Sequence, residues 1–128
     1  MKWYLSLAIC VLFAAATSAF AADDGNSKWR INQGNIYFPS SSIDLISTTN
    51  GAGNVKGVRC NAPNQISVSV YVNGGSAETF VFDPAYFANN DSGWIPYNIR
   101  FTSSIRVAIA RGSGSYGDNI CAVSWGLD

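Results

Sequence analysis

The fold is decided by residues 66–83, which read ISVSVYVNGGSAETFVFD. Over residues 66–72 every second side chain is aliphatic and the residues between are Ser or Tyr, so the segment predicts a strand with one apolar face. Asn73-Gly74-Gly75 is a turn sequence, and Phe80 and Phe82 continue the alternation beyond it. We therefore expect a β-hairpin over residues 66–83.

The same alternation recurs elsewhere in the chain. It gives residues 105–109 and 121–127 one apolar face each, and it puts Val58 and Cys60 on the same side of a further segment. Residues 29–38 and 43–46 supply one or two more strands, and no apolar segment is long enough for a helix of three turns. We expect an all-β domain of six to eight short antiparallel strands, and the sequence leaves a small OB-like barrel and a sandwich open.

Residues between the hairpin and the 105–109 segment are less regular. Asp83 and Pro84 predict the start of a short helix, the first as its cap and the second at its first position, which ends by Asn89. Residues 94–97 are expected in a loop or at a sheet edge, because Pro96 has no N–H to donate to a strand ladder.

Residues 1–21 have the pattern of a secretory signal, with a charged start at Lys2, an apolar run over 5–16 and the small-residue pattern Ala19-Phe20-Ala21. The apolar run is shorter than the roughly 20 residues that a transmembrane helix needs. We expect cleavage to leave residues 22–128 as one secreted or periplasmic domain with no membrane span.

Removal of this leader would take Cys10 with it and leave two cysteines, Cys60 and Cys121. An even number of cysteines in an exported protein predicts a disulfide, and the alternation directs both side chains into one core. The bond would close a loop of about 60 residues, for which the chain-entropy model gives roughly 4 kcal/mol.

The charge pattern argues against some partners. Eight basic and eight acidic residues give a net charge of zero, and no basic stripe is present to neutralise phosphates, so we expect no nucleic-acid partner. Asn, Ser and Gly dominate the polar residues instead, which suits an exported protein and contact with a neutral polyol such as a sugar.

Catalytic, metal and cofactor sites have few candidates. The chain has no His, so the commonest general base is missing, and two cysteines without His make a poor zinc site. Glu78 and the aspartates could form a glycosidase pair, but Glu78 follows a turn and Asp83 caps a helix, which favours structural roles. Residues 112–117 have the spacing of a dinucleotide fingerprint, yet a strand follows them, so we expect a hairpin loop. The prediction is a protein without enzymatic activity, metal or cofactor.

Aromatic residues are the main functional signal. Trp94 lies in Asn90-Asp91-Ser92-Gly93-Trp94-Ile95-Pro96-Tyr97, where turn residues surround two large rings. A ring beside amides and a carboxylate suits stacking on a sugar while bonding its hydroxyls, although a loop ring can also fold back over the edge of a core. The ligand-binding candidates are Trp94, Tyr97, Asp91, Asn90, Tyr71 and Tyr116.

Residues 104–109 and 120–125, joined by a loop rich in Gly and Ser, resemble the last two strands of small exported OB-type barrels. The B subunits of pentameric bacterial toxins are the best-known members, and the resemblance implies a glycan-binding module. The chain departs from them because it lacks a cysteine near the expected mature N-terminus and a long helix before Ile105. The oligomeric state therefore stays open, and the resemblance assigns no binding residue.

These observations favour a secreted, non-enzymatic module that recognises a glycan or an extracellular protein surface, in a role like that of a toxin B subunit or an adhesin. Two alternatives remain. One is a small exported inhibitor that plugs a hydrolase cleft with residues 112–119 or 89–97, and the other is a hydrolase that uses carboxylates.

Overall fold

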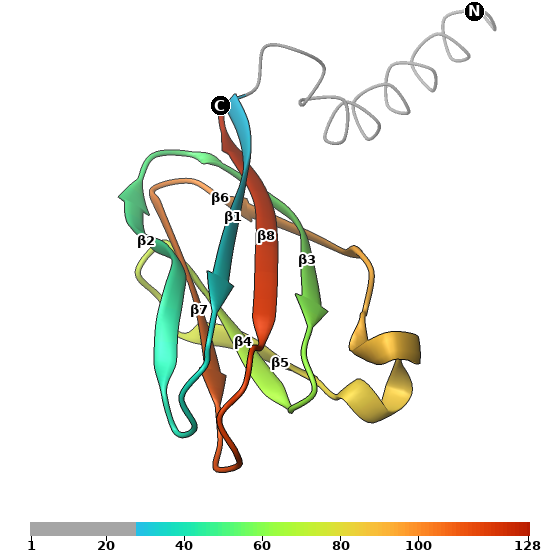
Figure 1. The fold of residues 1–128 in the computed structure, drawn as a ribbon. Coiled ribbons are helices and arrows are strands. Elements are labelled where there is room, and N and C mark those ends of the chain that lie inside the picture. The colour runs from blue at the N-terminus through green and yellow to red at the C-terminus, as the bar shows by residue number, and fades with distance from the viewer. Residues whose placement is uncertain (1–27) are drawn as a thin grey trace, which may run out of the picture.

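The computed structural model describes residues 28–128, so the predicted signal segment lies outside the described residues. Eight strands form two four-stranded antiparallel sheets (Figure 1). Sheet A has the order β1 (Lys28–Asn35), β8 (Ile120–Leu127), β3 (Gly53–Asn61) and β6 (Ile95–Phe101). Sheet B has the order β2 (Ser42–Asn50), β7 (Ser104–Arg111), β4 (Ile66–Val72) and β5 (Ala77–Phe82). The all-β prediction is confirmed, and of the two architectures left open the protein has the sandwich.

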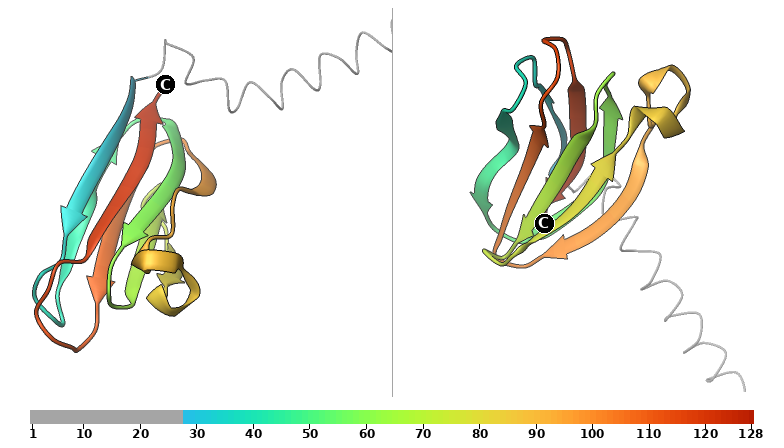
Figure 2. Two further views of the ribbon diagram at one scale, coloured as in Figure 1. Left: turned by 45° about the vertical axis from the view of Figure 1, so that its right-hand side comes forward. Right: turned by 90° about the horizontal axis from the view of Figure 1, so that it is seen from below.

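The strands pair in a nested pattern. The first described strand lies beside the last, the second beside the seventh, the third beside the sixth, and β4 beside β5. The chain thus runs as one long hairpin that is rolled up into two layers, which Figure 2 shows from two further sides. This eight-stranded arrangement is the jelly roll.

The hairpin predicted over residues 66–83 is confirmed as β4 and β5. Its turn uses Asn73 and Gly74 with φ of 55° and 71°, a left-handed backbone that Asn and Gly adopt at low cost. The Asn73 Oδ1 atom accepts hydrogen bonds from the backbone N–H groups of Thr102 and Ser103, both at 2.8 Å. The turn is therefore tied to the connection between β6 and β7.

The core lies between the two sheets and is built from the apolar faces that alternation predicts. Sheet B contributes Val68, Val70, Val107 and Ile109, and sheet A contributes Val58, Val123 and Trp125, all of them buried. Cys60 and Cys121 also belong to this core, where they lie directly opposite each other on β3 and β8 and form the predicted disulfide. Their Cα atoms are 4.1 Å apart, so the bond joins neighbouring strands of one sheet.

The connection from β5 to β6 holds two single-turn 3-10 helices, η1 (Pro84–Tyr86) and η2 (Ala88–Asn90). Asp83 caps η1 as predicted, since its Oδ1 accepts the N–H of Ala85 at 3.0 Å. Residues 95–101 form β6 at the edge of sheet A, which agrees with the expectation from Pro96. Within residues 28–128, no helix is both long enough and apolar enough to cross a bilayer.

One expectation for a loop was only partly right. Residues 112–119 do form a loop, but β7 and β8 belong to different sheets, so it is a connection across the sandwich and not a hairpin. The loop lies at the lower end of the molecule in Figure 1, beside the loop of residues 36–41 and away from the C-terminus.

Candidate functional site

The outer face of sheet A is hollowed where Ala122 and Ser124 of β8 and Gly57 of β3 carry small side chains or none. The strand register places Ile31 of β1, Ser124 of β8 and Gly57 of β3 in one row across the sheet. Gln33, Ala122 and Arg59 form the next row. Larger side chains thus flank a floor of Gly, Ala and Ser, and a groove runs along the sheet. We call it the sheet A groove.

The groove contains two adjoining hollows of about 350 and 560 Å³. Ile31 and Trp94 line both of them, on opposite sides. The larger hollow also has three polar side chains on its walls, those of Gln33, Arg59 and Asn61. A wide ring therefore lies beside two amides and a guanidinium, within one open depression.

Trp94 stands on the rim of this groove with 44% of its surface exposed. Its ring lies against Gly57, where an added Cβ would come within 3.6 Å of the indole Cε3 atom and 2.9 Å of the carbonyl oxygen of Ile95. The absence of a side chain at position 57 thus allows the close approach of β6. The Trp94 ring therefore packs against sheet A on one side and is exposed on the other.

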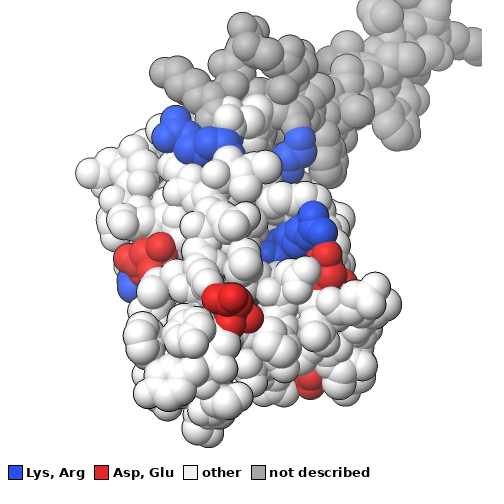
Figure 3. Space-filling view, in the orientation of Figure 1, with Lys and Arg blue, Asp and Glu red and all other residues white. Residues whose placement is uncertain are grey.

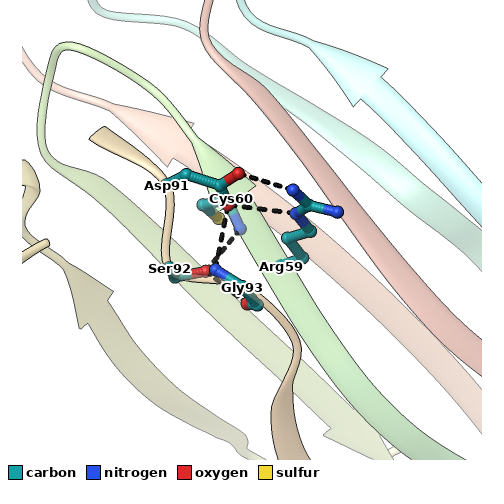
Figure 4. A network of polar contacts seen from close by, with 5 residues as sticks. All are labelled: Arg59, Cys60, Asp91, Ser92 and Gly93. Atoms are coloured by element: carbon teal, nitrogen blue, oxygen red, sulfur yellow. Dashed lines mark hydrogen bonds and ion pairs between the residues drawn. The ribbon is translucent and has the colours of Figure 1, made fainter. Parts of the chain in front are cut away.

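The turn before Trp94 is bonded to β3 (Figure 4). The backbone N–H of Cys60 donates to the Ser92 Oγ atom, and the N–H of Ser92 donates to the Cys60 carbonyl, both at 2.9 Å. The Asp91 Oδ1 atom accepts from Arg59 Nε at 3.0 Å and from the N–H of Gly93 at 2.9 Å. Gly93 itself has a φ of 61°, a left-handed conformation that suits glycine. Trp94 therefore follows a turn with little freedom.

The same contacts set the ionisation of Asp91. The hydrogen bond from the Arg59 guanidinium, followed by that from Gly93, lowers the pKa of the Asp91 carboxyl from 3.8 to about 2. The pair therefore carries both charges over the whole ordinary pH range, at the rim of the sheet A groove.

The structure separates Tyr97 from Trp94. Tyr97 is half-buried and packs against Phe80 of β5, with ring centroids 5.1 Å apart. Burial and then the Glu78 carboxylate raise the pKa of its phenol. Tyr97 thus closes the edge between the two sheets instead of facing the groove.

The other candidates lie in three places. Asn90 ends η2 beside Asp91, and its carbonyl accepts the N–H of Ala62 at 3.0 Å. Tyr71 is on sheet B, where the Arg106 guanidinium lies 4.7 Å from the ring centroid. Tyr116 is in the loop between β7 and β8. Trp94 lines the sheet A groove and Asp91 is ion-paired with Arg59 of its wall, whereas Asn90, Tyr97, Tyr71 and Tyr116 are not among the residues that line it.

Sequence reasoning missed the polar and apolar walls of the groove, Ile31, Gln33, Arg59 and Asn61. The available signal was the alternation along β1 and β3, which puts Ile31 with Gln33 and Arg59 with Asn61 on their outward faces. That alternation does not say which strands are neighbours.

Asp83, one of the carboxylates considered for catalysis, has structural partners. Asp83 caps η1 and also accepts from Gln65 Nε2 at 3.0 Å. Within residues 28–128, His, Cys, Asp and Glu side chains nowhere form a group of three or more that could hold a metal ion.

Comparison of the chain with models of protein families, with curated proteins and with solved structures gives no match.

Proposed function

We propose that this protein is a secreted, non-enzymatic binding module that holds a glycan in the sheet A groove, with Trp94 as the stacking surface. The observation that carries the proposal is the exposed Trp94 ring on the rim of a groove whose walls include Gln33 and Asn61. An indole ring offers an apolar surface to the C–H face of a sugar, and the amides exchange hydrogen bonds with its hydroxyls.

Preorganisation supports the same proposal. The bonds from Ser92 and Asp91 to β3 hold the turn before Trp94, so little conformational entropy is lost when a ligand covers the ring. The Arg59–Asp91 ion pair adds donors and acceptors at the rim, and Lys56 adds a donor in the smaller hollow, which suits the hydroxyls of a glycan.

The test is a glycan array with the purified, oxidised protein, followed by titration of the best ligand against variants. We expect Trp94→Ala to weaken binding by about tenfold or more, because the stacking surface is lost, and Trp94→Phe to retain part of the affinity. Tyr86→Ala is the matched control, since Tyr86 is an exposed ring on η1 that does not line the groove.

Two results would contradict the proposal. One is an array without any ligand, and the other is a ligand that Trp94→Ala binds as tightly as the unmodified protein does. Tight binding of a secreted hydrolase that depends on residues 112–119 would favour the inhibitor alternative instead.

A further inference from the structure

Three exposed aromatic rings form the lower end of the sandwich, far from Trp94 in the sequence. Tyr37, Phe38 and Tyr116 are 47%, 62% and 63% exposed. Their ring centroids are 5.5 Å apart for Tyr37 and Phe38, 5.9 Å for Tyr37 and Tyr116, and 5.6 Å for Phe38 and Tyr116. We call this cluster the aromatic tip. We infer that the aromatic tip inserts into the interface of a zwitterionic lipid bilayer.

Several backbone carbonyls below the aromatic tip accept hydrogen bonds from buried side chains. Arg111, only 4% exposed, donates from Nη1 to the Tyr37 carbonyl at 3.0 Å and from Nη2 to the Ser115 carbonyl at 2.5 Å. Asn119, fully buried, donates from Nδ2 to the carbonyls of Ile36 at 3.0 Å and Gly117 at 2.9 Å. Two buried side chains thus bond carbonyls of both loops.

Further bonds join the loops to each other. The N–H of Gly117 donates to the Tyr37 carbonyl at 3.1 Å, and the N–H of Ser40 donates to the Gly112 carbonyl at 2.9 Å. The Phe38 carbonyl accepts from the Ser41 hydroxyl. Backbone groups that lack water cost several kcal/mol each in a bilayer unless they are paired, and these carbonyls are paired before any lipid is met.

Charge is nearly absent from this end. Residues 36–41 read IYFPSS and residues 112–119 read GSGSYGDN, so Asp118 is their one charged residue. Asp118 accepts from Asn35 Nδ2 at 2.7 Å. Figure 3 shows neither a blue nor a red side chain at the lowest part of the face in view. Residues 36–41 and 112–119 contain no Lys or Arg that would attract anionic lipid, so the favoured surface is zwitterionic.

The ring chemistry also fits an interface. Tyrosine has an apolar body and a polar phenol, and aromatic residues gather where headgroups meet acyl chains. The aromatic tip projects at a loop end, so it suits a deformable layer. Because the sheet A groove uses other residues, the inference is independent of the glycan proposal.

The experiment is sedimentation of the purified protein with phosphatidylcholine vesicles. We expect the unmodified protein to bind. The double variant Phe38→Ser/Tyr116→Ser should lose at least about tenfold in affinity, because two aromatic rings are no longer transferred from water to the bilayer. Val81→Ser/Tyr86→Ser is the matched control, since both side chains are exposed apolar groups outside the aromatic tip, and it should bind as the unmodified protein does. Phosphatidylserine in the vesicles should not strengthen binding.

Fluorescence quenching tests whether residue 38 enters the bilayer. In the Phe38→Trp variant, the fluorescence of the tryptophan introduced at position 38 should be quenched by phosphatidylcholine that is brominated on its acyl chains. Trp94→Ala should keep full vesicle binding, which separates this inference from the glycan site.

The inference is overturned if the unmodified protein stays in the supernatant, if the two double variants lose binding equally, or if Phe38→Trp is not quenched. It is also overturned if the unmodified protein forms a dimer that Phe38→Ser/Tyr116→Ser dissociates, because the aromatic tip would then bind a second copy. Melting curves show whether each variant is folded, as expected for changes to exposed side chains.

Discussion

Trp94 and Tyr97 are close in the sequence but lie on different surfaces of the sandwich. Trp94 and Tyr97 are three residues apart, and on an extended chain an odd separation directs side chains to opposite faces. The structure follows that rule, since Trp94 lines the sheet A groove and Tyr97 packs on Phe80. The prediction that Trp94 is exposed depends only on the turn residues next to it in the sequence, so it could be made without knowing the fold. Grouping Tyr97 with Trp94 neglected the alternation.

Asp91 gives a prediction about pH. Its pKa is lowered to about 2, so the folded form binds this proton less readily than the unfolded form, whose pKa is near 3.8. The stabilisation by the Arg59–Asp91 pair is therefore complete well above pH 3.8 and is lost as the pH falls through about 2. We expect the NMR titration of the Asp91 carboxyl carbon to have its midpoint near 2.

A variant of Arg59 separates the two hydrogen bonds that lower the pKa of Asp91. Arg59→Met should raise the Asp91 midpoint but not fully restore 3.8, because the hydrogen bond from Gly93 remains. The difference in melting temperature between the unmodified protein and Asp91→Asn should shrink on acidification. A midpoint near 3.8 in the unmodified protein would show that the ion pair is not formed in solution.

At the scale of elements, alternation predicted strands and their buried faces well, and it failed where the chain leaves a sheet. Residues 112–119 were expected to form a hairpin because a strand precedes them and another follows. Which sheet each strand joins depends on contacts with β2, β4, β1 and β3, which lie far away in the sequence. For the same reason the meeting of Tyr37 and Phe38 with Tyr116 could not be foreseen.

Asn119 joins the two loops and gives a prediction at this scale. Its Oδ1 accepts from Asn64 Nδ2 at 3.1 Å, and its Nδ2 donates to two loop carbonyls. Asn119→Ala leaves buried polar groups without partners, so we expect the free energy of unfolding in urea to fall by about 2 kcal/mol or more. Asn98→Ala, at an exposed position on β6, is the control and should change it by less than about 0.5 kcal/mol. Equal losses in the two variants would mean that the buried contacts of Asn119 do not stabilise the loops.

For the whole molecule, the nested pairing explains why barrel and sandwich could not be distinguished from the sequence. Alternation identifies the face of each strand but not its neighbour, and the jelly roll pairs β1 with β8 across almost the full described chain. The sheet A groove depends on the same long-range order, because its walls come from β1, β3 and the turn before β6. The cysteines were the exception, since the two that remain after the predicted leader can pair in only one way.

That disulfide gives the prediction for the molecule as a whole. Cys60 and Cys121 are 61 residues apart, and the bond between them shortens the loops that the unfolded chain can explore. The chain-entropy model assigns roughly 4 kcal/mol to a loop of this length, a large share of the stability of one small domain. We expect Cys60→Ala/Cys121→Ala to lower the free energy of unfolding in urea by about this amount, and reduction of the unmodified protein to have a similar effect. Because the two cysteines link β3 and β8, which form the floor of the sheet A groove, the proposed glycan binding should weaken as the variant unfolds and recover under conditions that restore its fold. A midpoint in urea that is the same for the oxidised protein and the variant would show that the bond does not stabilise the sandwich.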